Sequence, residues 1–335
     1  MQWVDAMRGF SMIMVVLGHV LMCMKIGGYH SVLSSILLTF RMPLFFFVSG
    51  YFSYRLITWW NNDRTLNILK RKIQAQIIGT AIFLSIYNFT FNLPYFNGFG
   101  GYWFTIVLFQ MYCIYLLSTW VCIWIKRDII IPILILISCI FLIILVTYNR
   151  ASAIWNYMCW ENLTKYMQFF TLGIICCKYK NQFFDLLEKD WFRTMMISGW
   201  VICMILWYSS DFKNFSSALY AFVHDIIVRY FALMTVIIVF FSHKSLFKDE
   251  SSKGVKLIEF VGRRTLDIYF LHYFFLPNLG FLQEWLSQGN MIVPQIIISG
   301  TITIVILGLC LLISNILRKS HILQMWLFGV KNRLQ

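Results

Sequence analysis

Residues 291–317 read MIVPQIIISGTITIVILGLCLLISNIL, an apolar stretch that contains no charged side chain. A bilayer-spanning helix needs about 20 predominantly apolar residues, so this stretch is long enough to cross a membrane. Similar runs recur along the chain, and together they predict about ten spans. Their approximate bounds are 9–25, 32–54, 73–91, 102–124, 129–147, 163–177, 195–210, 226–242, 260–281 and 291–317.

The composition of the whole chain is that of a membrane protein. Of its 335 residues, 60% are hydrophobic and 13% are charged, whereas an ordinary soluble domain has about 45–50% apolar and about 25% charged residues. The strands of a transmembrane barrel would give short alternating segments, not long apolar runs. We therefore expect an all-α fold, a single transmembrane domain over residues 1–335 that forms a bundle of about ten helices.

The net charge of +14 follows the predicted topology. With the N-terminus in the cytoplasm, the segments on that side hold most of the 28 lysines and arginines. The few basic residues left on the outer side are Lys25, Arg150, Lys165, Lys213 and Arg229. This is the positive-inside pattern of multi-pass proteins. We expect an inner or plasma membrane protein with both termini in the cytoplasm, whose charge requires no nucleic-acid partner.

The nine cysteines form no C-x-x-C pair and no Cys/His cluster with zinc-ligand spacing. We expect them to be mostly small core side chains and predict no metal site. No small-residue cleavage site follows the first apolar run, so this run is interpreted as an uncleaved first span.

Ionisable residues inside the apolar runs are the candidate functional residues, because a charge at mid-bilayer costs about 2.5–3.5 kcal/mol. Arg8 and His19 are eleven residues apart, about three helical turns, and therefore share one face. Arg8 would lie at the cytoplasmic mouth and His19 near the middle of the membrane. There a neutral imidazole could take a proton from a hydroxyl or a thiol. The alternative is a histidine that only hydrogen-bonds a neighbouring helix.

The second run contains Arg41 and Pro43. Proline frees a backbone carbonyl, and such a group is tolerated at membrane depth only where protein or water satisfies it. This pattern predicts a broken or re-entrant helix beside a cavity, with Arg41 at a depth close to that of His19. The alternative is an arginine that snorkels to the outer headgroups.

The segment GRRTLDIYFLH, residues 262–272, repeats the plan of the first run. Arg263 and Arg264 would lie at the cytoplasmic mouth, with His272 about two and a half turns deeper and Tyr269 one turn before it on the same side. A structural hydrogen bond is the alternative role for His272. We predict that His19, His272 and their arginines converge on one polar chamber within the membrane.

Two weaker signals complete the pattern. Trp103 opens the fourth run, where aromatic residues of the membrane interface are also expected. Lys70, Arg71 and Lys72 could hold the phosphates of a cofactor, and an ordinary positive-inside cluster explains them equally well.

Taken together and in this order, these segments resemble membrane acyltransferase family 3, a family of integral-membrane O-acyltransferases. The resemblance covers the whole chain, through the Arg-x10-His pattern of the first run, RMPLFFFVSGY from residue 41, Trp-Phe at 103–104 and residues 262–272. It implies transfer of an acyl group, commonly acetyl, from acyl-CoA to a sugar hydroxyl. The expected acceptor is a cell-surface polysaccharide or its lipid-linked precursor.

The resemblance also implies roles for residues. His19 is similar to the family's catalytic histidine and Arg8 to its paired arginine, while the acceptor side is expected to involve Arg41, Trp103, Tyr269 and His272. The acetyl-CoA side is expected to involve Lys70, Arg71, Lys72, Arg263 and Arg264. Many members carry R-x-x-R at the start of the third span, and this chain keeps only its first arginine, because Gln74 occupies the second position.

Two other functions remain open at this point. Broken helices and midplane charges also mark transporters, so a flippase for a lipid-linked saccharide is the main alternative. Such a protein would usually contain inverted repeats, and none is visible in the sequence. A membrane-anchored assembly protein is the third possibility, although it would give no reason for His19 and His272 to be buried.

Overall fold

The structure is a computed structural model that describes residues 2–26, 31–56, 62–93, 99–147, 153–209, 223–247, 253–287 and 291–329. Every regular element within these ranges is a helix, which confirms the all-α prediction. The chain divides into two compact units, and each is described by itself. Unit 1 contains Met1–Val48, Tyr179–Ile268 and Phe275–Leu309, and unit 2 contains Ser49–Lys178, Tyr269–Phe274 and Cys310–Gln335.

Four helical segments in the described residues are long and apolar enough to cross a membrane. They are Trp3–Cys23, Val32–Tyr54, Gly100–Ile125 and Ile292–Leu317. They correspond to the predicted spans 9–25, 32–54, 102–124 and 291–317. Two further apolar helices, Ile130–Leu145 and Ile226–Ser242, are shorter. The total of about ten spans stays a prediction.

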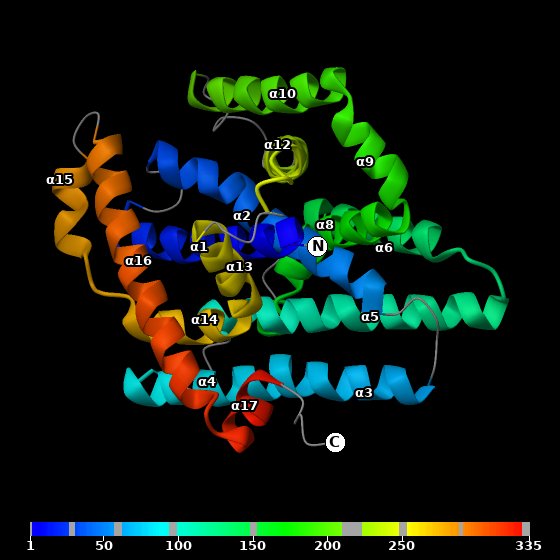
Figure 1. Cartoon of the computed structure of the whole chain (residues 1–335), viewed down its shortest axis with the longest axis horizontal. Coiled ribbons are helices and arrows are strands. Elements are labelled where there is room, and N and C mark those ends of the chain that lie inside the picture. Colours follow the sequence, from blue (N-terminus) through cyan, green and yellow to red (C-terminus); the bar gives the residue numbers. More distant parts are fainter. Residues whose placement is uncertain are drawn as a thin grey trace. The chain divides into compact units, whose positions relative to one another are not determined.

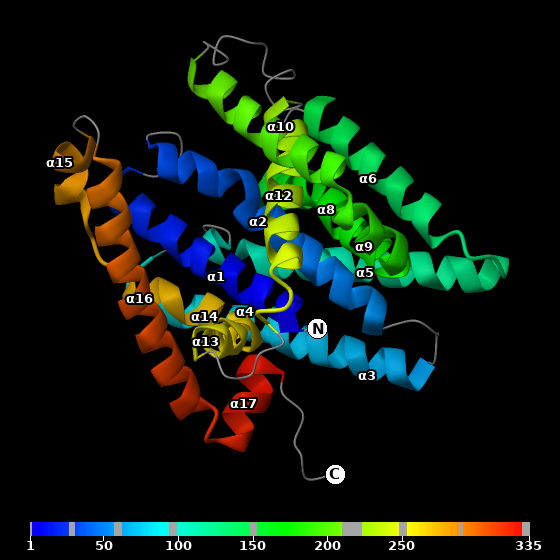
Figure 2. The same cartoon turned by 45° about the horizontal axis from the view of Figure 1, so that its top comes forward.

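Unit 1 is built mainly around the first helix. Its elements are α1 (Gln2–Cys23), the first part of α2 (Val32–Leu56), α9 (Lys180–Glu188), α10 (Asp190–Ser209), η4 (Val223–Val228), α12 (Arg229–Ser242), α13 (Lys253–Arg263), the start of α14 (Thr265–Leu271), η6 (Gly280–Leu282), α15 (Gln283–Ser287) and most of α16 (Ile292–Leu317). Helix α13 packs along α1, and α10 packs on α12 (Figures 1 and 2). Trp3 anchors the start of α1 between the rings of Phe184 and Phe241.

Two glycines allow α1 and α13 to cross with their backbones in contact. A Cβ on Gly9 would overlap the carbonyl oxygen of Ile258, and a Cβ on Gly262 would overlap the carbonyl oxygen of Asp5. Small residues at such crossings are typical of helices that associate closely in membranes. The crossing brings the first turns of α1 against the end of α13.

Unit 2 contains the other helices. They are the end of α2, α3 (Asn62–Lys72), η1 (Ile73–Ile78), α4 (Gly79–Thr90), η2 (Gly100–Tyr102), α5 (Trp103–Ile125), α6 (Ile130–Thr147), α7 (Ala153–Tyr157), α8 (Trp160–Lys178), the end of α14, η5 (His272–Phe275), the end of α16 and α17 (His321–Phe328). Elements α3, η1 and α4 follow one another without a break and run beside α5 in both views (Figures 1 and 2). Helix α6 packs on α8.

The prediction of a broken or re-entrant second helix was wrong. Helix α2 continues from Val32 to Leu56 with Pro43 inside it. A neighbouring helix supplies a donor to this stretch, because the Ser11 hydroxyl donates a hydrogen bond to the carbonyl oxygen of Arg41 at 2.9 Å. Pro43 lacks the N–H that would bond the carbonyl of Thr39 four residues earlier, so the Ser11 bond joins α1 to α2 and does not replace the missing donor.

Two predicted spans have different bounds in the structure. The helix expected at 73–91 already begins at Asn62, because a run rich in lysine and arginine is a good helix former even though it is not apolar. The single span expected at 260–281 is not one helix. It consists of α13, α14 and η5, interrupted at Arg264 and ended at Phe275, two residues before Pro277, since the residue before a proline avoids helical backbone angles.

Candidate active site

The polar face of α1 is the first part of the candidate site. Because α1 is uninterrupted from Gln2 to Cys23, Arg8 and His19 leave the same face about 16 Å apart along the axis. Both side chains are half-buried in unit 1. The helix therefore presents a guanidinium near its start and an imidazole three turns further on.

The buried carboxylate of Asp267 interacts with Arg8 at the start of this face. Asp267 is 0% exposed, and its Oδ2 lies 3.4 Å from Nη1 of Arg264. Arg8 interacts electrostatically with both Asp5 and Asp267. Asp267 thus serves two arginines, one from its own segment and one from α1. The sequence interpretation gave Asp267 no role, although its spacing of three residues from Arg264 was a usable signal for an ion pair.

Arg41 is brought onto α1 from the neighbouring helix. Its carbonyl oxygen accepts the Ser11 hydroxyl, the ring of Phe40 stacks on that of Phe10 at 6.0 Å, and its guanidinium lies on Gly18. The side chain therefore turns toward α1. The Arg41 guanidinium contacts Gly18, the residue before His19. This contact agrees with the expectation that Arg41 and His19 lie at a similar depth.

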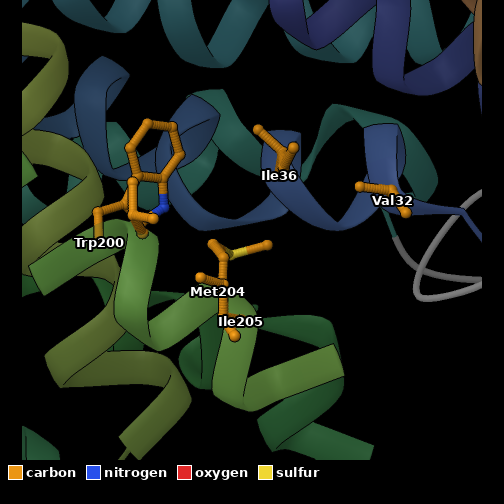
Figure 3. Close-up of a pocket in the computed structure, with 6 residues that line it drawn as sticks. Val32, Ile36, Trp200, Met204 and Ile205 are labelled. Carbon is orange, nitrogen blue, oxygen red and sulfur yellow. The ribbon is translucent and has the colours of Figure 1, made fainter. Parts of the chain in front are cut away.

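A separate cavity of about 380 Å³ lies between α2 and α10 in unit 1 (Figure 3). Its lining residues are Val32, Ile36, Trp200, Val201, Met204 and Ile205. None of these six residues is titratable, so this cavity offers hydrocarbon surface and no acid or base. It is not the polar chamber that the sequence predicted.

In unit 2, Tyr269 connects α14 to the start of α5. Its hydroxyl donates to the carbonyl oxygen of Gly101 at 2.8 Å and accepts the backbone N–H of Phe104 at 3.2 Å. A tyrosine has one hydroxyl proton, and that of Tyr269 is already donated in the hydrogen bond to the carbonyl oxygen of Gly101. Tyr269 is therefore poorly placed to donate to an oxyanion in this conformation.

His272 and Trp103 both pack inside unit 2. His272 is 0% exposed, and the centre of its ring lies 4.0 Å from that of Tyr273. Trp103 stacks on Tyr166 with ring centres 6.0 Å apart. Trp103 therefore packs against protein, and both its substrate-side role and its place in an interface belt stay predictions.

The predicted phosphate-binding residues differ in what surrounds them. Lys70, Arg71 and Arg263 are exposed. Arg264 is paired with Asp267, and Nζ of Lys72 lies 4.6 Å from the ring centre of Tyr112. The three exposed side chains have the freedom to meet a phosphate.

The predicted residues thus fall into two groups. Unit 1 contains Arg8, His19, Arg41, Arg263 and Arg264, and unit 2 contains Lys70, Arg71, Lys72, Trp103, Tyr269 and His272. His19 lies in unit 1 and His272 in unit 2, so a polar chamber shared by these two histidines stays a prediction.

The comparisons with known proteins give one match. The family model described as an acyltransferase domain, that of membrane acyltransferase family 3, matches residues 1–315. Comparison with curated proteins and with solved structures found no match. The matched range includes all the candidate residues of both units, and the apolar helices agree with a membrane protein. This chain therefore belongs to membrane acyltransferase family 3 and is a membrane acyltransferase.

Proposed function

We propose that this acyltransferase moves an acetyl or related acyl group from acyl-CoA to a sugar hydroxyl of a cell-surface polysaccharide or its lipid-linked precursor. The observation that carries the proposal is the contact of the Arg41 guanidinium with Gly18, the residue before His19. This contact puts a cation, which can stabilise an oxyanion, beside the turn of α1 that carries His19, whose imidazole can act as a base.

His19 is the general base of the proposed reaction. Its imidazole takes the proton of the sugar hydroxyl while the oxygen forms a bond to the carbonyl carbon of the thioester. The carbon–sulfur bond then breaks, and the thiolate of CoA leaves with the proton from the imidazolium. The products are the O-acyl sugar and free CoA, and the base is restored.

Arg41 is the proposed donor to the oxyanion that forms at the carbonyl oxygen. Donors of this kind contribute about 10²–10³-fold to the rate. Because the hydroxyl proton of Tyr269 is donated to Gly101, Arg41 is the better supported of these two residues for the role.

The phosphates of CoA are assigned to the exposed Lys70 and Arg71 of unit 2, and a role of the exposed Arg263 of unit 1 stays a prediction. Arginine can bind a phosphate in a bidentate manner, and lysine binds it as a point charge. Arg8 interacts electrostatically with Asp5 and Asp267. We therefore assign Arg8 the task of ordering the start of the His19 helix and not that of binding phosphate.

The test uses the purified full-length chain in lipid nanodiscs, acetyl-CoA labelled in its acetyl group, and the glycan fraction of the host. We expect acceptor-dependent release of free CoA thiol and label in the glycan. A transporter or assembly protein would release no thiol and transfer no label. That outcome would refute the proposed reaction.

A further inference from the structure

A line of polar side chains, which we call the polar seam, runs through unit 2 between α5 and the continuous helix formed by α3, η1 and α4. Lys72, Gln76 and Thr80 lie on successive turns of one helix, and Tyr112 and Thr105 lie two turns apart on the other. The two ends of the seam are in contact. Nζ of Lys72 is 4.6 Å from the ring centre of Tyr112, and the hydroxyls of Thr80 and Thr105 share a hydrogen bond of 2.6 Å.

Gln76 lies between these two contacts. It is one turn from Lys72 and one turn from Thr80, both of which touch α5, and its side chain is only 6% exposed. Gln76 therefore faces α5 from the interior of the seam. It belongs to the π-helical element η1, a local widening of the helix that is frequent at functional sites.

Two polar atoms of the seam have no hydrogen-bond partner among the described residues. They are Oε1 of Gln76 and the hydroxyl of Tyr112, which is 0% exposed. Buried polar atoms are almost always satisfied in folded proteins, because leaving one without a partner reduces stability. Two such atoms on one seam indicate a ligand that offers both hydrogen-bond donors and acceptors.

The chemical character of the seam changes along its length. The Lys72 end adjoins the exposed, positively charged Lys70 and Arg71. At the other end, the Thr105 hydroxyl donates a hydrogen bond to the carbonyl oxygen of Tyr102. The Tyr102 hydroxyl in turn donates to the carbonyl oxygen of Phe270 at 3.0 Å. Phe270 is two residues before the buried His272. The seam thus leads from the surface proposed to bind phosphate to the backbone of the segment that carries His272.

We infer that the polar seam binds the pantetheine arm of acyl-CoA, an inference that rests on the proposed function. This arm is a narrow chain with two amides, phosphates at one end and the thioester at the other. An amide N–H of the arm donates to Oε1 of Gln76, and the Tyr112 hydroxyl donates to an amide carbonyl. Lys72 lies at the phosphate end.

The first test compares two acyl donors, acetyl-CoA and S-acetylpantetheine, which lacks the nucleotide and all phosphates. Tyr112→Phe and Gln76→Met are each expected to raise KM for both donors about tenfold, the loss of one buried hydrogen bond, with kcat within about twofold of the wild-type value. Lys72→Met is expected to raise KM for acetyl-CoA only, because only that donor carries phosphates.

Gln110→Met is the matched control. Gln110 also has a buried Oε1 without a partner among the described residues, and it lies two residues from Tyr112, on the opposite face of α5. The control is expected to leave KM for both donors unchanged. An equal rise of KM in Gln110→Met would overturn the inference.

The second test separates binding from a structural role. Thermal unfolding of the full chain is followed with and without CoA. Tyr112→Phe removes a buried hydroxyl that has no hydrogen-bond partner in the described part of the chain, so the unfolding temperature without CoA is expected to stay level or rise. The increase caused by CoA is expected to shrink. A lower unfolding temperature without CoA, together with an undiminished increase on adding CoA, would show a structural role only.

The outcomes distinguish this inference from the proposed function. If the wild-type chain consumes acetyl-CoA and both seam variants retain its KM, the seam does not bind the donor and the proposed reaction stands. If the wild-type chain neither consumes acetyl-CoA nor is stabilised by CoA, both fail. If Gln76→Met does not fold, Tyr112→Phe alone decides.

Discussion

The guanidinium of Arg41 lies directly on the backbone of Gly18. A Cβ at position 18 would overlap Nη1 of Arg41, so only glycine allows the arginine to come this close. The Ser11 hydroxyl donates a hydrogen bond to the backbone carbonyl of Arg41 and joins α1 to α2 at this level. One glycine thus sets the position of a cation beside the helical turn that carries His19.

Gly18→Ala is expected to displace the guanidinium and to lower kcat of acyl transfer about 10²-fold, because a misplacement of about 1 Å at a reacting centre has effects of this size. Steady-state kinetics with acetyl-CoA measures the change. Gly300→Ala is the control, since a Cβ there meets nothing within 4 Å. Wild-type kcat in Gly18→Ala would show that this contact does not matter for the reaction.

Gly262→Ala is expected to separate α1 from α13, because the new methyl group overlaps the carbonyl oxygen of Asp5. Overpacking of this kind destabilises a protein by about 1–3 kcal/mol, measured by denaturant or thermal unfolding in detergent. Gly254→Ala on the same helix has open space around its Cβ and is expected to be neutral or stabilising. Equal stability of the two variants would contradict the close crossing.

Asp267→Asn removes the carboxylate that serves Arg264 and Arg8. Breaking a buried ion pair leaves an uncompensated charge, and the expected loss of stability is about 3–5 kcal/mol. The comparison is Asp128→Asn, whose carboxylate is 69% exposed and pairs with Lys178 at 2.6 Å. Exposed pairs contribute at most about 1 kcal/mol. Unfolding measurements that rank Asp128→Asn as the more damaging variant would argue against the role of Asp267.

The topology proposed from the charges is tested with single cysteines in a chain whose nine native cysteines are replaced. Arg127→Cys is expected in the cytoplasm and Leu93→Cys on the outer side, and both positions are exposed. A membrane-impermeant maleimide added to intact cells is expected to label position 93 only. Labelling of position 127 instead would invert the assignment of both termini.

Much of the helical framework could be predicted from the sequence. The bounds of α2, α5 and α16 agree with the predicted spans to within about two residues, because long, predominantly apolar runs form helices in a bilayer, where every backbone polar group must be satisfied. Hydrophobicity predicts less well where a helix extends beyond an apolar run or is interrupted within one. The charged residues 62–72 extend a helix that no apolar pattern marks, and Arg264 and Pro277 divide a run that looks continuous by composition.

The candidate site was predictable only where it depends on spacing along one helix. The separation of Arg8 and His19 sufficed to place them on one face of α1. The electrostatic interaction of Arg8 with Asp267 and the contact of Arg41 with Gly18 join residues from different helices, and the periodicity of one helix cannot predict such pairs. The glycines next to Arg8 and before Arg263 were the visible hint, since only small residues permit backbones to touch.

The measurement that tests the account most directly is kcat of acyl transfer by His19→Ala, compared with the wild-type chain at equal acetyl-CoA and acceptor. Loss of a general base is expected to lower kcat about 10²–10⁴-fold, while the unfolding temperature and the stabilisation by CoA stay close to those of the wild type. A folded His19→Ala protein that transfers the acyl group at the wild-type rate would contradict the account.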